Sequence, residues 1–237
     1  MPATLHRLAA APDLVDQAYR ALVDAISAGV LAPGERFTQE ALAERLAVSR
    51  QPVLQALRLL KADGLVQDAP GRGLQVAPLD AALIAHVYAV RGALDALAAR
   101  LAAARRAVMP PALLRAGRAA AQAGDVPALI EADLAFHQAL YAASGNPLIQ
   151  RSAAPHWCQI RRAMGAVLQT GDAPRTVWDQ HAAIADAVAA GDAARAADLA
   201  QRHGDDASHH LGQAWSSMTA APVPHTPHTP KTAGDAR

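Results

Sequence analysis

The chain has 237 residues and a net charge of +1, with 22 basic and 21 acidic side chains. This balance gives no global positive field and therefore no general sign of a nucleic-acid partner. At about 150 residues per domain, the length predicts two modest domains. Because 52% of the residues are hydrophobic and only 3% aromatic, with alanine dominant, we expect a mainly α-helical fold.

Cysteine content and hydropathy indicate the cellular setting. The single cysteine, Cys158, cannot form a disulfide within the chain. The amino-terminal stretch lacks the unbroken apolar run of a signal peptide, and no segment resembles the roughly 20 apolar residues of a membrane span. We therefore expect a soluble cytoplasmic protein with no membrane partner.

The amino-terminal third of the chain alternates short helices with turns. Residues 1–12 predict an irregular lead, and residues 14–28 place apolar side chains at helical spacing. A Pro-Gly turn follows, after which Thr38 is a candidate N-cap of a short helix that ends near Ala47. These features predict two helices joined by a loop.

The sequence Ser49-Arg50-Gln51-Pro52 predicts the start of a third helix. Ser49 can cap this helix by accepting from backbone N–H groups of the next turn, and Pro52 lies in the first turn, where a missing N–H costs least. An apolar stripe then defines a buried face. The opposite face carries Arg50, Gln51, Leu54, Gln55, Arg58 and Lys61.

Two β-type runs, residues 65–68 and 74–77, flank a glycine-rich turn with Arg72 near its tip and predict a β-hairpin. Three helices and a hairpin form a winged helix-turn-helix, which holds one helix in the major groove of DNA. There Arg50 can pair with guanine and Gln51 with adenine, while Arg72 can reach the minor groove or the backbone. The structural alternative is a three-helix packing unit whose basic residues are merely solvated.

The segment LAPGERFTQEALAERLAVSRQPVLQALRLLKADGLVQDAPGRGLQVAPLD resembles the DNA-binding domain of the GntR superfamily of bacterial transcription regulators. The resemblance implies a homodimer on double-stranded DNA with a pseudo-palindromic operator. Leu54 stands where the family commonly has arginine, so one contact is either absent or replaced by contact with a thymine methyl group. The candidate DNA-binding residues are Ser49, Arg50, Gln51, Pro52, Arg58 and Arg72.

From residue 79 the composition changes to long segments rich in alanine and leucine. We expect a winged helix-turn-helix domain at 13–78, then an all-helical domain of about six to seven helices at 79–217. The expected helices are 80–107, 110–123, 125–144, 146–169, 173–190 and 192–217. Pro155 predicts a kink or split in the fourth of them, and the Pro/Thr-rich residues 218–237 predict a disordered tail.

Four polar side chains interrupt apolar helix faces in this second domain. Asp133 and His137 are four residues apart and share one face, and His181 and His203 lie on the apolar stripes of two later helices. Such groups are costly to bury unless they are partnered. One carboxylate and three imidazoles directed into a bundle predict a divalent metal site. The alternative is that each histidine is an ordinary hydrogen-bonded core residue.

Two further features belong to this candidate site. His209 and His210 are alternatives to His203. Arg91, on the first long helix, stands four residues before Asp95. It can form an intrahelical ion pair or offer a cation to an anionic ligand inside the bundle.

Residues 80–215 resemble the all-helical FCD effector domain of the FadR-like branch of the same superfamily. The resemblance rests on the spacing of Asp133, His137, His181 and His203. It implies that these four residues bind a metal whose open positions accept a small carboxylate, and that Arg91 meets the acid. Zinc and nickel are the first candidates for the ion.

Together these features predict a DNA-binding transcription regulator, not an enzyme. Its operator affinity would be modulated by a small organic acid, a carboxylate metabolite, bound at the metal site of the helical domain. Two alternatives remain open. One is a metal-dependent hydrolase that activates water at the same site, and the other is a direct metal-ion sensor.

Overall fold

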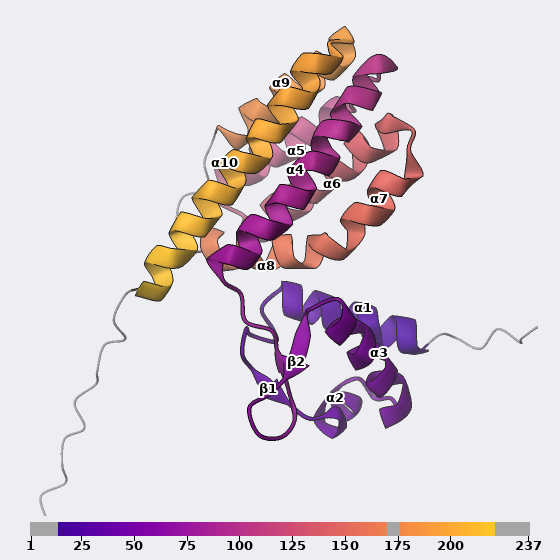
Figure 1. Cartoon of the computed structure of the whole chain (residues 1–237), viewed down its shortest axis with the longest axis vertical. Coiled ribbons are helices and arrows are strands. Elements are labelled where there is room, and N and C mark those ends of the chain that lie inside the picture. Colours follow the sequence, from indigo (N-terminus) through magenta and orange to yellow (C-terminus); the bar gives the residue numbers. More distant parts are fainter. Residues whose placement is uncertain (1–13, 170–175, 221–237) are drawn as a thin grey trace, which may run out of the picture.

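The structure is a computed structural model that describes residues 14–169 and 176–220. Figure 1 shows a small amino-terminal part with a short sheet and, after a connecting segment, a larger bundle of helices. The prediction of a mainly α fold, with a winged helix-turn-helix before a helical bundle, is confirmed. The predicted lead at 1–12 lies outside the described residues.

The amino-terminal part has three helices and a three-stranded sheet. In chain order the elements are α1 (Leu14–Ser27), β1 (Arg36–Phe37), α2 (Gln39–Arg45), α3 (Arg50–Ala62), β2 (Val66–Asp68) and β3 (Leu74–Val76). The sheet order is β1-β3-β2 and both pairings are antiparallel. The sequence did not predict β1, because a two-residue strand is too short to show alternation and exists only through its pairing with β3.

The two predicted helix starts differ in their capping. The Thr38 hydroxyl accepts from the backbone N–H of Ala41 at 3.2 Å, as expected. Ser49 is the N-cap residue of α3, but its side chain makes no capping hydrogen bond, so that part of the prediction is wrong. Ser49 is exposed, where water can satisfy the first N–H groups of the helix.

A separate core holds the amino-terminal part together. The predicted apolar stripe of α3 is buried against α1, with Val53 and Leu60 at 0% exposure and Leu22 of α1 at 3%. Leu54, next to Val53 in the chain, is only half-buried. One residue of the helical bundle, Cys158, also packs into it, so the two parts share apolar contacts.

The bundle contains seven α-helices among the described residues. They are α4 (Ala81–Ala104), α5 (Pro111–Ala123), α6 (Val126–Ser144), α7 (Pro147–Ala153), α8 (Trp157–Leu168), α9 (Val177–Ala190) and α10 (Ala193–Ala220). The predicted fourth helix is split at Pro155, where a 3-10 turn, Ala154–His156, separates α7 from α8. Helix α10 continues three residues beyond the predicted end at 217, and residues 221–237 lie outside the described part of the chain.

Helices α4 and α10 run antiparallel along one side of the bundle (Figure 1). A methyl group added at Gly204 of α10 would lie 3.2 Å from the Cα of Gly92 of α4, so the two backbones approach closely because both residues lack a side chain. By length and composition α4 could cross a membrane, contrary to the sequence analysis. However, it buries Arg91 and Asp95 against the bundle, and core helices of soluble domains meet the same criteria.

Helix α8 joins the bundle to the amino-terminal part. Besides the packing of Cys158, its Gln159 side chain donates to the carbonyl of Gly64 at 3.2 Å. Arg162 donates to the carbonyl of Ala77, in the connector before α4, at 2.5 Å. These contacts place the winged part directly against the helix that borders the bundle interior.

Candidate metal centre

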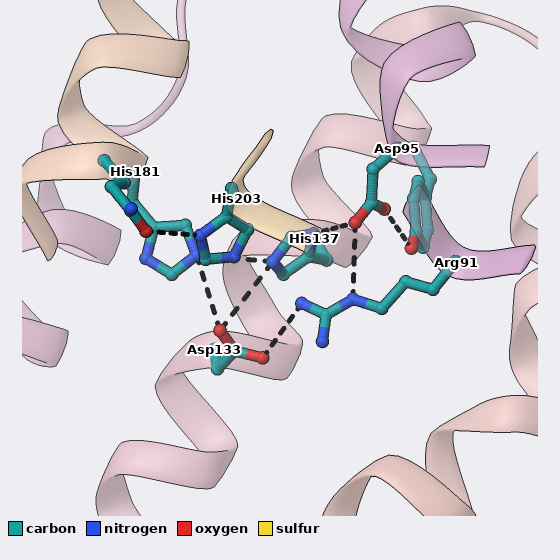
Figure 2. Close-up of polar contacts among 8 residues, drawn as sticks. Arg91, Asp95, Asp133, His137, His181 and His203 are labelled. Carbon is teal, nitrogen blue, oxygen red and sulfur yellow. Dashed lines mark hydrogen bonds and ion pairs between the residues drawn. The ribbon is translucent and has the colours of Figure 1, made fainter. Parts of the chain in front are cut away.

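Four side chains from three helices meet in the interior of the bundle (Figure 2). Asp133 and His137 lie on α6, His181 on α9 and His203 on α10, and all four are buried. One potential ligand atom of each lies within 4.8 Å of the corresponding atoms of the others. The structure therefore brings together the residues that the sequence singled out, and His203, not His209 or His210, completes the group.

The distances within this group suit a small ion. His181 Nε2 lies 3.4 Å from Asp133 Oδ1 and 3.3 Å from His137 Nε2. Ligand atoms that bind zinc at about 2.0–2.2 Å stand at most about 4.4 Å apart. A small side-chain adjustment would thus bring all four within reach of one ion.

Two contacts orient the imidazoles of this group. Asp95 Oδ2 lies 3.2 Å from His137 Nδ1, and Gln180 Oε1 lies 3.0 Å from His203 Nδ1. A proton on each Nδ1 would leave Nε2 as the atom that binds metal, the usual role of such partners. His203 Nε2 is buried and has no hydrogen-bond partner among the described residues, which is an arrangement that a bound ion would relieve.

Arg91 lies between two buried carboxylates, as Figure 2 shows. Its Nε is 3.3 Å from Asp95 Oδ2, which is the intrahelical pair, and its Nη2 is 3.2 Å from Asp133 Oδ2. The guanidinium carbon also lies 4.7 Å from the centre of the Trp157 ring and 5.2 Å from that of Tyr88. Arg91 is 2% exposed, so it belongs to the buried site and not to the surface.

Both carboxylates are held in the ionised form. Burial alone would raise the pKa of Asp133, but the charges of Arg91 and His137 outweigh it and hold this pKa well below its usual range. Burial would also raise the pKa of Asp95, but His137, Arg91 and a hydrogen bond from Tyr141 lower it to about 2. With neutral imidazoles, Arg91 and the two carboxylates leave one uncompensated negative charge in the interior.

Burial favours the neutral form of two of the imidazoles. It lowers the pKa of His181, and it lowers that of His203 well below the ordinary value. Neutral imidazole is the form that binds metal. The interior thus combines two neutral nitrogen ligands with one ionised carboxylate, which is a suitable donor set for a divalent transition metal.

A tryptophan missed by the sequence analysis forms one wall of the site. The Trp178 ring centre lies 4.6 Å from that of His181. The ring fits there because residue 117 is glycine, and a Cβ at that position would lie 2.0 Å from a ring atom. Asp95, Gln180 and Trp178 gave no signal of their own in the sequence, apart from the position of Asp95 one helical turn after Arg91.

A cavity of about 250 Å³ opens beside the four-residue group. We term it the effector cavity. Its lining residues are Tyr88, Arg91, Ala121, Leu129, Asp133, Met164, Leu168, Thr176, Val177, Trp178, Gln180, His203, Asp206, Ala207, His210 and Leu211. The cavity therefore provides access for a small molecule to Arg91 and to two members of the group.

The candidate DNA-binding residues lie in the amino-terminal part. Ser49, Arg50 and Gln51 are exposed at the start of α3, as are Arg58 farther along it and Arg72 between β2 and β3. In contrast, Pro52 is buried, so its side chain supports the helix and is not offered to a groove. Arg50 Nη1 lies 3.2 Å from Glu40 Oε1 of α2.

Comparison with known families assigns both parts. Residues 14–76 match the model of the bacterial regulatory proteins of the gntR family, and residues 86–206 match the FCD domain. A transcriptional regulator of the helix-turn-helix type from an unstable DNA locus of Streptomyces ambofaciens is 34% identical over 178 residues, covering 73% of this chain and 74% of the relative. LutR of Bacillus subtilis is 32% identical over 203 residues, covering 72% of this chain and 89% of LutR.

Solved structures show the same fold. E. coli McbR/YncC superposes with a TM-score of 0.72 at 22% identity, over 84% of this chain and 97% of that one. A GntR regulator from Rhodococcus sp. RHA1 gives a TM-score of 0.69 at 22% identity, over 88% of this chain and 99% of that one. The winged helix-turn-helix and the helical bundle thus define a DNA-binding transcription regulator with an effector domain. The chain belongs to the GntR family, in the group that carries an FCD domain.

Proposed function

We propose that a small organic acid, bound at a divalent metal centre in the bundle, modulates the affinity of this regulator for its operator. The metal ligands are Asp133, His137, His181 and His203, with zinc or nickel as the ion. The observation that supports this is the convergence of four buried ligand atoms within 4.8 Å of one another. When bound, the ion would supply positive charge and open coordination positions for a carboxylate oxygen.

Charge links the acid to the metal. Without an ion, Arg91 is already neutralised by Asp95 and Asp133, and with neutral imidazoles these groups together carry one net negative charge. An incoming carboxylate would meet repulsion there. A divalent cation reverses the sign of this charge, so acid binding depends on prior metal binding.

Helix α8 is positioned to pass a change in the site to the DNA-binding part. Trp157 lies against the guanidinium of Arg91 and, at 5.7 Å between ring centres, against His137. The next residue, Cys158, places its sulfur 3.1 Å from the hydroxyl of Ser27 on α1. A displacement of Arg91 by an acid would thus move α8 against α1, and a coupling free energy of about 1–3 kcal/mol would suffice for regulation.

We infer that the functional unit is a homodimer on a pseudo-palindromic operator and that it acts in the cytoplasm. Gel-shift titrations with operator fragments are the direct test, run on zinc-loaded and metal-free protein with and without small carboxylates. Sequence-selective binding that changes only with metal and acid together supports the proposal. If metal alone changes operator binding, the chain is an ion sensor, and sequence-blind binding would reject the DNA-binding role.

Replacing Trp157 with leucine should weaken the coupling between the helical bundle and the DNA-binding part without loss of the metal. A cation–π contact contributes about 0.5–2 kcal/mol, so its loss should reduce the acid-induced change in operator affinity roughly 2- to 30-fold. Metal content should stay unchanged, and gel shifts with and without acid measure the effect. Trp215→Leu, half-buried on α10 away from the effector cavity, is the matched control. An unchanged response in the Trp157 variant would remove α8 from the mechanism.

Lowering the pH should release the metal. Protons compete with the ion for the imidazoles, and the low pKa values of His181 and His203 in the fold mean that these groups stay neutral near pH 7. Because the unfolded chain protonates its histidines at about pH 6.5, protonation and metal loss both disfavour the folded state below that pH. Metal content after dialysis should fall below about pH 6. Full retention at pH 4 would contradict this set of ligands.

A further inference from the structure

The effector cavity has one polar end that is buried. Arg91, Asp133 and His203 are 2%, 5% and 3% exposed, respectively. The walls that lead from this end are apolar and consist of Ala121, Leu129, Met164, Leu168, Val177, Trp178, Ala207 and Leu211. A bound acid would therefore place one carboxylate at the buried end and the rest of the molecule among hydrocarbon side chains.

Among the described lining residues, the outer polar side chains offer no permanent cation for a second acid group. Gln180 is already engaged, since its Oε1 contacts His203 Nδ1 at 3.0 Å and its Nε2 donates to Asp206 at 2.8 Å. Asp206 itself would repel an anion. His210, exposed at the rim, offers in its neutral form a single N–H. Along the walls a second carboxylate would lose its hydration without gaining a partner, which is strongly unfavourable.

The size of the effector cavity also restricts the ligand. The volume of the effector cavity is about 250 Å³. This is below the roughly 300–1,000 Å³ of sites for drug-sized ligands. A chain of about five carbon atoms or a single ring would fill it.

We propose that the effector is a monocarboxylate with a compact apolar body, and that dicarboxylates of the same length are rejected. This inference rests on the proposed function, because it places the acid group at the end formed by Arg91 and the metal ligands. It adds a chemical class that the fold and the ligand group do not specify. The observations behind it are the apolar walls and the position of Arg91, the one buried cation among the described residues that line the effector cavity.

Pentanoate and glutarate form a matched pair for the test, because they differ only in a terminal methyl group and a terminal carboxylate. Calorimetric titration of the zinc-loaded full chain at pH 8, where histidines are ordinarily neutral, should show pentanoate binding roughly tenfold or more tightly than glutarate. Benzoate should bind in the range of pentanoate. Equal or tighter binding of glutarate would overturn the proposal that the effector is a monocarboxylate, while leaving the proposed function intact. No binding of any acid would instead contradict the proposed function.

A variant that adds a cation to the wall should reverse the preference. Leu168→Arg, at the half-buried end of α8, should raise the glutarate-to-pentanoate affinity ratio roughly tenfold or more. Leu148→Arg is the matched control, because Leu148 is 62% exposed and lies outside the cavity. Met164→Lys places a cation on the same wall and serves if the first variant does not fold. An unchanged ratio in a folded cavity variant would overturn the inference.

Discussion

Replacing His181 with alanine is expected to abolish stoichiometric metal binding. The His181 nitrogen lies between Asp133 and His137, at 3.4 and 3.3 Å, so its removal opens the centre of the ligand group. Loss of a residue that merely orients a ligand lowers metal affinity about 10–100-fold, and loss of a ligand should exceed this range. Elemental analysis and competition with a chelating dye measure the change.

His86→Ala is the control for this experiment, because His86 is an exposed histidine of α4 outside the ligand group. It should keep the metal content of the unaltered chain. Circular dichroism of both variants verifies that the bundle is still folded. A His181→Ala variant that binds one equivalent of metal with unchanged affinity would show that the four residues form an ordinary buried polar cluster.

Replacing Arg50 with alanine is expected to weaken specific operator binding by about 1–3 kcal/mol, or roughly 5- to 150-fold. Arg50 is exposed at the first turn of α3, from which a guanidinium can reach guanine in the major groove. Its ion pair with Glu40 is solvent-exposed and so should cost little to exchange for a base. Fluorescence anisotropy against specific and scrambled duplexes separates the loss of specificity from the loss of charge.

Arg115→Ala is the matched control, since Arg115 is an exposed arginine of α5. It should leave specific binding unchanged. Leu54→Ala should also have a small effect, because Leu54 is half-buried and offers at most an apolar contact to DNA. Equal loss of affinity in all three variants, or none in Arg50→Ala, would contradict the assignment of α3 as the recognition helix.

Helices were predictable from the sequence wherever apolar residues repeat at helical spacing. The stripe of α3 is buried as expected, and Pro155 separates α7 from α8. Strand β1 was not predictable, because two residues carry no period and the strand forms only by hydrogen bonding to β3. The prediction that the Ser49 side chain caps α3 was wrong, and its residue type did not distinguish it from Thr38, which is equally exposed and does cap its helix.

The candidate site was predictable in part. Asp133, His137, His181 and His203 each interrupt an apolar helix face, and burial of such groups requires partners, so the spacing indicated all four but left His209 and His210 as alternatives to His203. Asp95 and Gln180, which orient the imidazoles, were not selected. Their role depends on which helix lies opposite.

The sequence by itself determined the two-part organisation, the helices and the residues that must find polar partners inside the bundle, because hydrophobic periodicity and the cost of burying charge act along the chain. Only the tertiary structure decided that Arg91 lies between two carboxylates, that it is the one buried cation among the described residues of the effector cavity, and that α8 contacts both the site and α1. These features depend on the packing of helices that are distant in sequence, and no local pattern encodes such distances.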